Sequence, residues 1–426
     1  GREGQNDLGE SEAPAQADRK TMGNSCLIEA RQTDHPCPFT APEWANVYPD
    51  DASMMDKNHD FIGTGVNFWW IELGGEQDTI ADTQTLNMEL LKIAFGVWDH
   101  IKNRGDHGAD NWELEWVGFL PGKRESRRYE GDYMLTQQDL STGRPFPDVV
   151  AYGGWTMDNH LPAGFYAPGY SSHHLPVNAP YPIPYRCLYS RNVENLFCAG
   201  RNISVTHWAL SSTRVMGTCA LLGQAVGTAA AIAIKERLSP RGVYEKKLSL
   251  LRRTLMDDDS YLPFQTREIP EISRNAMLTG CENVETLRDG FDRPVGEIDH
   301  GCRMEKGTCI EYRFPAPVRV SGARIIWDSD LNRTDQPEVQ GTRFSHNMMC
   351  NKPLNFGDFH VPGSMVRAYR LEGVKEDGSV QLLHAAANNY QRLNQIPISG
   401  AYRAIRLIPE ETWGSRDVHL FSFEVY

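Results

Sequence analysis

The sequence places two histidines where they could take part in proton transfer. His160 lies two residues after Asp158, and a carboxylate at that distance can orient an imidazole ring. His207 lies between the pair Gly200-Arg201 and a long segment of small residues, which Arg214 directly precedes. Because histidine titrates near neutral pH, either ring is suited to accept the proton of a hydroxyl group. We take Asp158, His160, His207 and Arg214 as candidate catalytic residues. A structural role stays open for each histidine, and a helix-end ion pair for Arg214.

A basic run and a histidine pair are further candidates for binding. Arg124, Arg127 and Arg128 could grip a carboxylate or sugar hydroxyls, or could form a solvated charged turn. The pair His173-His174 has no third ligand at a spacing typical of a metal site, so we assign no metal. The sequence also lacks H-E-x-x-H, a phosphate-binding glycine loop with lysine, and G-x-S-x-G.

The segment from Asn195 to Ala231 must position several of these residues. It predicts a short buried strand, a turn at Gly200-Arg201, a loop, and a long helix that begins near Val215. Gly223, Gly227 and Ala231 recur every four residues, so one face of the helix carries almost no side-chain atoms. Another element or a ligand could pack closely against that face. The helix N-terminus offers free N–H groups to an electron-rich ligand. Although the apolar window Val215–Ile234 is long enough to span a bilayer, its Ala, Gly and Thr content favours a packing helix.

The remaining patterns predict two domains of different character. A helix is expected over Asp78–Asn103, with Thr79 or Asp82 as its cap, and another over Tyr244–Met256. Alternation predicts strands at Val66–Ile71 and Trp112–Trp116, and long ordered loops are expected from Gly143 to Pro184. After a boundary near residue 275, short alternating runs and a turn at Glu376–Gly378 predict a β-sandwich. The runs lie at Cys309–Phe314, Val318–Val320, Ala323–Trp327, Ala401–Pro409 and Leu420–Tyr426.

Composition limits the possible partners. The 426 residues suffice for two or three domains, and the net charge of −13 argues against a non-specific binder of nucleic acid or of anionic membranes. Nine cysteines are an odd number, which excludes complete pairing within one chain but allows a bridge such as Cys302–Cys309. The compartment and the oligomeric state stay open, with a periplasmic or other extracytoplasmic location favoured over the cytoplasm.

Four segments together resemble a known enzyme family. Asn195–Ala231, Pro121–Thr136, Val149–Trp155 with Asp158 and His160, and Met22–Ser25 are similar to bacterial FAD-dependent oxidoreductases with the glutathione-reductase type of flavin fold. The resemblance covers roughly residues 1–250 and implies a mixed α/β domain, which we place at residues 1–270. It implies FAD as the cofactor, bound by Gly200, Arg201, Thr213, Met216, Gly217 and Thr218, and a substrate site that includes Arg124, Arg127 and Trp155. The family motif G-x-G-x-x-G is absent, since Gly63-Thr-Gly65 is followed by Val, Asn and Phe. We therefore expect a chain that begins after the first part of the flavin domain, either as a fragment or after processing.

The second domain, placed at residues 276–426, resembles discoidin-like (galactose-binding-like) jelly-roll modules. Leu287–Pro294 and Val318–Trp327 carry the likeness. The resemblance implies a carbohydrate-binding module or a structural cap, and the candidates for exposed loop residues are Trp327, Asp328, Asp330, Arg333 and Trp413.

Three functions follow as hypotheses. The first is an FAD-dependent oxidoreductase that transfers hydride from a sugar, a polyol or a related hydroxylated substrate. The second is a non-catalytic carbohydrate-binding or scaffold protein derived from that fold. The third is a polysaccharide lyase or hydrolase that uses His160. No paired-carboxylate motif in the sequence supports this third hypothesis.

Overall fold

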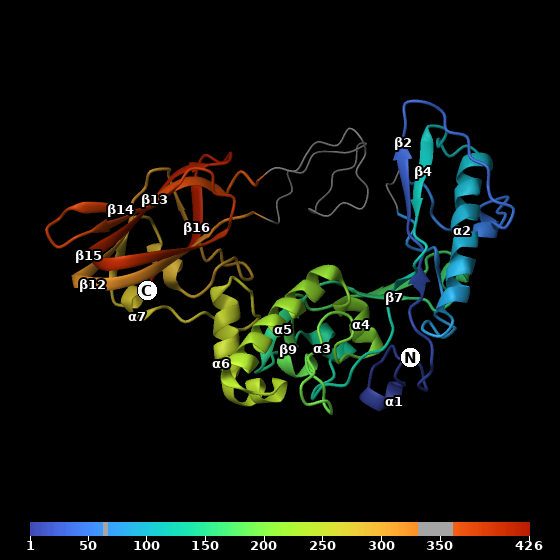
Figure 1. The fold of residues 1–426 in the computed structure, drawn as a ribbon, viewed down its shortest axis with the longest axis horizontal. Coiled ribbons are helices and arrows are strands. Elements are labelled where there is room, and N and C mark those ends of the chain that lie inside the picture. The colour runs from blue at the N-terminus through green and yellow to red at the C-terminus, as the bar shows by residue number, and fades with distance from the viewer. Residues whose placement is uncertain (63–66, 331–360) are drawn as a thin grey trace. The chain divides into compact units, whose positions relative to one another are not determined.

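The computed structural model describes residues 1–62, 67–330 and 361–426 (Figure 1). The chain divides into two compact units, each described here by itself. Among the described residues, the N-terminal unit comprises Gly1–Leu255 and Ser260–Phe264, and the C-terminal unit comprises Met256–Asp259 and the residues from Gln265 onward.

The N-terminal unit mixes helices with small antiparallel sheets, which confirms the predicted α/β class. Its sheets are one of three strands in the order β3-β1-β5 and the pairs β2-β4, β6-β9 and β7-β8. The elements are α1 Gln5–Leu8, β1 Asn24–Ser25, β2 Ile28–Gln32, η1 Ala52–Met54, β3 Glu72–Leu73, α2 Thr83–Asn103, β4 Trp112–Val117, β5 Gly122–Lys123, α3 Gln137–Thr142, β6 Val149–Gly153, β7 Met157–His160, η2 Gly164–Tyr166, β8 Ser172–Leu175, β9 Tyr181–Pro184, η3 Tyr185–Cys187, α4 His207–Thr213, α5 Met216–Glu236 and α6 Pro240–Asp257.

Helix α2 has the predicted core face but a later start. The expected apolar side chains are all buried: Leu86, Leu90, Ile93, Ala94, Val97 and Ile101. The helix begins at Thr83 rather than Asp78, because the Asp78 Oδ1 atom accepts hydrogen bonds from the N–H groups of Ile80 and Ala81 and closes a separate turn.

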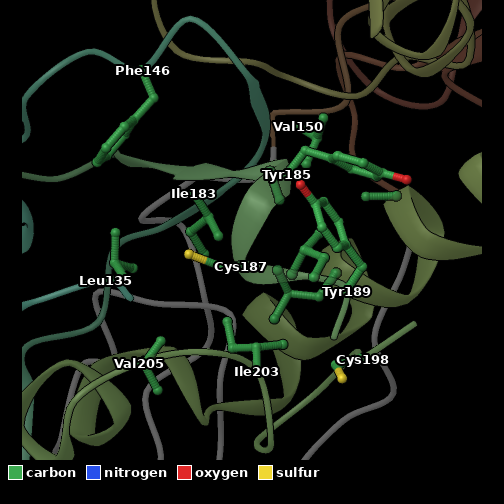
Figure 2. Packing of buried hydrophobic residues seen from close by; sticks show 14 of the residues in the cluster. Leu135, Phe146, Val150, Ile183, Tyr185, Cys187, Tyr189, Cys198, Ile203 and Val205 are labelled. Carbon is green, nitrogen blue, oxygen red and sulfur yellow. The ribbon is translucent and has the colours of Figure 1, made fainter. Parts of the chain in front are cut away.

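The small-residue helix is present as α5, but its approach differs from the prediction. The predicted strand near Asn195 is wrong, since Phe197 forms only an isolated bridge with Tyr189. The predicted loop before the helix contains α4, which Thr206 caps by accepting from the Ala209 N–H at 3.2 Å. One side of α5 packs into the main hydrophobic cluster of the unit, through Leu222, Ala225 and Ala229. Figure 2 shows other members of that cluster, which include Tyr185, Tyr189, Ile203 and Val205.

Two regions of the N-terminal unit correct the strand predictions. Residues 143–184 are not loops throughout, because they contain β6, β7, β8 and β9 in two antiparallel pairs. These strands are too short for alternation to reveal them. The strand predicted at Val66–Ile71 is wrong, since residues 67–71 form no strand and the two-residue β3 begins only after them, whereas β4 confirms the strand expected at Trp112. Residues 63–66 lie outside the described part of the chain.

The C-terminal unit is built around an antiparallel sheet, as predicted for an all-β domain. The strand order is β11-β16-β12-β15-β13-β14, and β10 pairs with β12. The separate strands expected from Cys309 to Trp327 join into β12, whose pairing with β15 shifts register twice and so bends the sheet. The elements are α7 Glu271–Arg274, β10 Met277–Thr279, η4 Val284–Arg288, β11 Cys302–Met304, β12 Ile310–Trp327, β13 Val366–Val374, β14 Val380–Ala386, β15 Leu393–Thr412 and β16 Val418–Val425.

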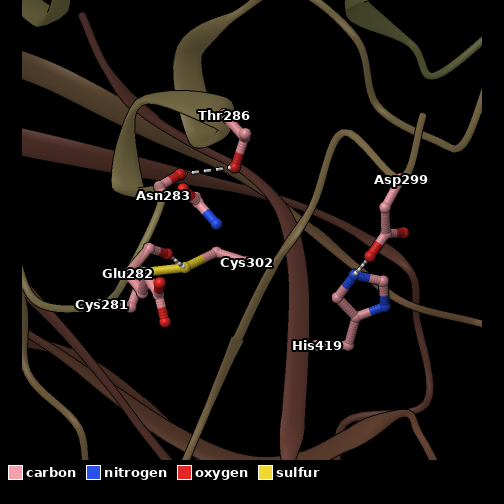
Figure 3. Close-up of a disulfide and its surroundings, with 7 residues drawn as sticks. All are labelled: Cys281, Glu282, Asn283, Thr286, Asp299, Cys302 and His419. Carbon is pink, nitrogen blue, oxygen red and sulfur yellow. Dashed lines mark hydrogen bonds and ion pairs between the residues drawn. A yellow bond between two sulfur atoms is a disulfide. The ribbon is translucent and has the colours of Figure 1, made fainter.

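The disulfide and one aromatic residue of this unit differ from expectation. Cys302 pairs with Cys281, which precedes η4, and not with Cys309 (Figure 3). Trp327 is fully buried in the core instead of exposed on a loop, and its Nε1–H donates to Asn394 at 3.2 Å. Trp413 is 39% exposed, and Arg333 lies outside the described residues.

Among the described residues, α5 is the one helix long and apolar enough to cross a membrane by length and composition, a test that core helices of soluble proteins also pass. Its contacts with the cluster of Figure 2 agree with a packing helix.

Candidate functional site

Three side chains converge on the carboxylate of Asp158. Strand β7 pairs with β8 so that Asp158 lies opposite His174, and the Oδ1 atom of Asp158 is 3.3 Å from Nε2 of His174. Oδ2 of Asp158 lies 3.2 Å from Nε2 of His160 and 3.0 Å from NH2 of Arg214. The structure thus brings together the predicted residues Asp158, His160 and Arg214, and adds His174, which the sequence analysis considered only as a metal ligand.

The surroundings of Asp158 keep its carboxylate ionised. Burial alone raises its pKa, but the hydrogen bond from His160 and the positive charges of His160, Arg214 and His174 outweigh burial and lower the pKa to about 2. Asp158 is therefore a permanent anion at neutral pH that can bind protonated or cationic groups.

This lowered pKa predicts that Asp158 stabilises the protein above about pH 4 and loses that effect as the pH falls toward 2. The folded-state pKa is below the ordinary 3.8, so the unfolded chain binds the proton first and acid favours unfolding. The contribution is at most about 2 kcal/mol. In urea unfolding, Asp158→Asn should be less stable than wild type near pH 6, and the difference should shrink below about pH 4. Asp34→Asn, at a side chain that is 96% exposed, serves as the control. A difference that is the same at both pH values would contradict the prediction.

His160 is held inside the protein between two carboxylates. Its side chain is 5% exposed, and its Nδ1 lies 2.7 Å from Oε2 of Glu72, whose side chain is fully buried. Glu72 also pairs with Arg124, whose NH1 is 3.1 Å from the same oxygen. Trp69 packs edge-on against the imidazole ring, with ring centroids 4.9 Å apart. Both ring nitrogens therefore have internal partners.

His207 is likewise enclosed. It begins α4, and its Nδ1 and Nε2 atoms lie 2.8 Å from Oε2 of Glu125 and Oδ1 of Asn159. Burial raises the pKa of Glu125, but His207 and Arg128 outweigh it, so the net shift is downward. Asn159 stands between Asp158 and His160 on β7, and successive side chains of a strand point to opposite faces. His207 therefore lies on the face of β7 opposite to that of Asp158 and His160.

The basic run divides into inward and outward residues. Arg124 donates to Ser25 Oγ at 2.7 Å and to the Trp69 carbonyl at 3.2 Å, which ties it to the interior beside His160. Arg128 bonds Glu3 and the Val205 carbonyl, each at 2.7 Å. Arg127 is exposed.

The start of α5 is open. Gly200, with a φ of +86°, and Gly217 both have empty space where a Cβ atom would stand. Met216 is 90% exposed, and Val215 provides no side-chain cap for the first N–H groups of the helix. Thr213 and Thr218 are buried, and among the described residues the Thr213 hydroxyl has no hydrogen-bond partner. Arg201 is exposed and donates to the Lys123 carbonyl. An open helix terminus of this kind fits an electron-rich group.

Exposed aromatic rings lie beside the Asp158 cluster. Tyr170 is 66% exposed, and its ring centroid is 5.5 Å from that of Trp69 and 6.1 Å from that of His174. Trp155 is 42% exposed and lies two residues before the start of β7. Its carbonyl accepts a hydrogen bond from Ser212 of α4 at 2.5 Å.

The sequence analysis missed Glu72 and His174. Glu72 follows the tryptophan-rich segment and lies far from His160 in the chain, so only tertiary structure reveals the pair. His174 required the register of β7 and β8, because the strands themselves were not predicted.

Comparison with known proteins identifies the class of enzyme. A family model described as FAD dependent oxidoreductase matches residues 1–255, and the chain belongs to this family. No curated protein matches the chain.

Solved structures similar to the C-terminal region include carbohydrate-binding modules. The family 32 module of EndoD from Streptococcus pneumoniae is 12% identical, with a TM-score of 0.26, and the match covers 36% of this chain and 97% of that module. The family 32 module of NanJ from C. perfringens, solved in complex with galactose, is 10% identical, with a TM-score of 0.23 and coverage of 35% and 90%.

Proposed function

We propose that this protein oxidises a hydroxylated compound, of the sugar or polyol type, with FAD as the cofactor. One observation carries the proposal: Arg214, two residues before the open start of α5, bonds Asp158 at 3.0 Å, so the charged cluster around Asp158 is tied to the chain next to the helix terminus. FAD, when bound, supplies the acceptor for the hydride that leaves the substrate carbon.

The residues around the start of α5 fit such a cofactor. Gly200 and Gly217 leave room for a planar or phosphate-bearing group to approach the backbone. A Cβ atom placed on either glycine would meet no other part of the protein within 4 Å. The uncapped N–H groups of α5 would stabilise negative charge on that group. Arg201 would meet a phosphate with its guanidinium group.

The Asp158–His174 pair is the proposed proton acceptor. His174 has a side chain that is 38% exposed, and it is the histidine of the cluster that reaches the surface. The substrate hydroxyl would give its proton to the His174 ring, and the anionic Asp158 would stabilise the imidazolium that forms. His160 and His207, which the sequence analysis proposed as acid/base residues, become positioning residues, because their side chains are only 5% and 2% exposed and are bonded to buried groups. The ring nitrogens of His174 also have partners, the hydroxyls of Thr156 and Ser172, each at 3.1 Å, but its side chain reaches the surface.

The proposed substrate surface combines aromatic and basic groups. Trp155 and Tyr170 offer exposed rings for packing against the C–H face of a sugar. Arg127, a member of the basic run, is also exposed. Arg124 is proposed to hold Glu72 and thereby His160 in place, instead of contacting the substrate itself.

Flavin binding by the full-length protein tests the proposal. We expect the purified protein to retain FAD after gel filtration, and a sugar or polyol from a panel to bleach the flavin absorbance without oxygen. Gly217→Val should weaken retention more than Gly227→Val, which makes the same change on the same helix roughly 15 Å further along. Equal retention by both variants would contradict the assignment of the α5 N-terminus. A protein that retains no added FAD would overturn the proposal and favour the non-catalytic carbohydrate-binding or scaffold function.

A further inference from the structure

Three histidine rings from separate parts of the sequence meet at the C-terminal end of α2. His100 lies in the last turn of α2, His107 in the loop that follows it, and His59 after η1. One nitrogen from each ring lies within 4.8 Å of the other two, and the ring centroids are 4.9–5.1 Å apart. The spacing of the histidines in the sequence did not predict this cluster, because only the tertiary structure brings His59 next to His100 and His107.

Hydrogen bonds fix the orientation of all three rings. In each ring one nitrogen donates to a backbone carbonyl: His59 Nδ1 to Lys57 at 2.7 Å, His100 Nδ1 to Tyr48 at 2.8 Å, and His107 Nε2 to Arg104 at 3.1 Å. A carbonyl oxygen can only accept, so the bonded nitrogen carries the proton and the other nitrogen of a neutral ring presents its lone pair. Metal-binding histidines in proteins are oriented by hydrogen bonds of this kind.

A carboxylate lies beside two of the three rings. Oδ1 of Asp51 lies 3.4 Å from Nε2 of His100 and 3.7 Å from Nε2 of His59. These separations are close to the roughly 3.3 Å expected between two ligands of a tetrahedral ion that each bind at 2.0–2.1 Å. Nε2 of His100 is buried and has no hydrogen-bond partner among the described residues. A buried nitrogen of this kind requires a partner, and a cation at the centre of the cluster would provide one.

The approach to the cluster is acidic. A hollow beside it is lined by four aspartates and one lysine, together with Asn58 and two of the histidines: Asp51, Asp56, Asp60, Asp106, Lys57, His59 and His107. The ammonium group of the neighbouring Lys57 turns away and donates to the carbonyl of Gly169 at 2.7 Å and to that of Ala167. The hollow therefore attracts cations and repels anions.

We propose that His59, His100, His107 and Asp51 bind one divalent metal ion, with Zn²⁺ the best chemical match. Imidazole nitrogens and carboxylate oxygens are typical zinc ligands. Among the described residues from Gln32 to Glu72, η1 is the one helical turn and no strand lies between β2 and β3. The ion joins this irregular segment to the end of α2 and stabilises it, as structural metals do.

Metal binding by the full-length protein tests this proposal. After dialysis against a chelator, we expect the protein to bind one Zn²⁺ per chain by calorimetry, and to give the visible absorption of tetrahedral Co²⁺ when Co²⁺ is added instead. Zn²⁺ should raise the Tm, and the chelator should lower it again. Asp51→Asn and His107→Gln should each weaken Zn²⁺ binding about tenfold or more.

The variants are chosen to fold. The side chain of Asp51 is 67% exposed and His107 lies in a loop, so neither change opens a cavity in the core. His35→Gln, at a side chain that is 69% exposed and outside the cluster, is the matched control and should bind Zn²⁺ as wild type does. The absence of saturable binding in wild type would overturn the proposal. Unchanged binding in both Asp51→Asn and His107→Gln, or an equal loss in His35→Gln, would also overturn it.

Discussion

Replacement of Arg267 by methionine is expected to lower the free energy of unfolding of the C-terminal unit by about 3–5 kcal/mol. The Arg267 side chain is 3% exposed, and its NH1 donates to Oε2 of Glu424 at 2.7 Å. Glu424 is itself 1% exposed, so loss of the guanidinium group would leave a buried carboxylate without its partner. The cost of an uncompensated buried charge exceeds what the intact pair contributes.

Two further residues make this a balanced group of four charges. Arg324 donates to both oxygens of Asp292, at 2.8 and 3.1 Å, and Nε of Arg267 lies 3.5 Å from the same carboxylate. Burial is the largest influence and lowers the pKa of Arg267, while Arg324 and Arg267 overcome the effect of burial on Asp292 and lower the pKa of that carboxyl. The double variant Arg267→Met/Glu424→Gln restores the charge balance and should recover part of the lost stability.

The two units of the chain need not unfold in a single transition, so the stability of the C-terminal unit is best measured separately. Hydrogen exchange of the backbone amides in peptides from β12 and β16 gives the free energy of opening of this unit within the full chain. Arg370→Met is the matched control. Arg370 has a side chain that is 42% exposed and pairs with Glu372 at 2.8 Å, so its loss should cost about 0–1 kcal/mol. Equal losses in Arg267→Met and Arg370→Met would show that the buried group contributes no more than a surface ion pair.

Helices α2 and α5 were predictable because each is long and buries a periodic face, whereas the seven-residue α4 lies in a predicted loop. The buried apolar residues of α2, from Leu86 to Ile101, recur over about four turns, and the glycines and alanines of α5 leave a pattern that no strand shares. The strands of residues 143–184 escaped prediction for the opposite reason. Each has four or five residues, and its pairing depends on a partner up to 35 residues away, as for Val149 and Pro184. Local sequence cannot specify such pairs.

The candidate site was predictable only where its members are neighbours in sequence. Asp158 and His160 lie two residues apart on one strand, and Arg214 lies next to a recognisable helix start. His174 entered the site through strand register, and Glu72 through tertiary packing. The sequence does not show burial either, since a buried histidine and an exposed one look the same in it. The sequence analysis therefore proposed His160 and His207 as acid/base residues, whereas our proposal assigns that role to the more exposed His174.

Replacement of His174 by glutamine is expected to slow flavin reduction by the hydroxylated substrate about 10²–10⁴-fold, if His174 accepts the substrate proton. Glutamine keeps a polar group opposite Asp158 but cannot take up a proton at neutral pH. Retention of FAD should not change, because His174 lies on β8 and not among the residues proposed for the cofactor. Stopped-flow measurement of the flavin absorbance under anaerobic conditions gives the rate of flavin reduction. When that rate is measured over a series of pH values, the variant should lack the pH-dependent step that the imidazole causes in wild type.

His173→Gln provides a matched control on the same strand. His173 is exposed and lies opposite Asn159, and its ring is directed toward Trp208 with the centroids 6.1 Å apart, so it has no contact with Asp158. This variant should reduce the flavin at nearly the wild-type rate. A structural role of His174 would instead slow the reaction without changing the shape of the pH profile, and Asp158→Asn would then not resemble His174→Gln. Because Asp158 is held ionised by a pKa of about 2, its loss should remove the stabilisation of the imidazolium and give the same pH-dependent defect as the loss of His174.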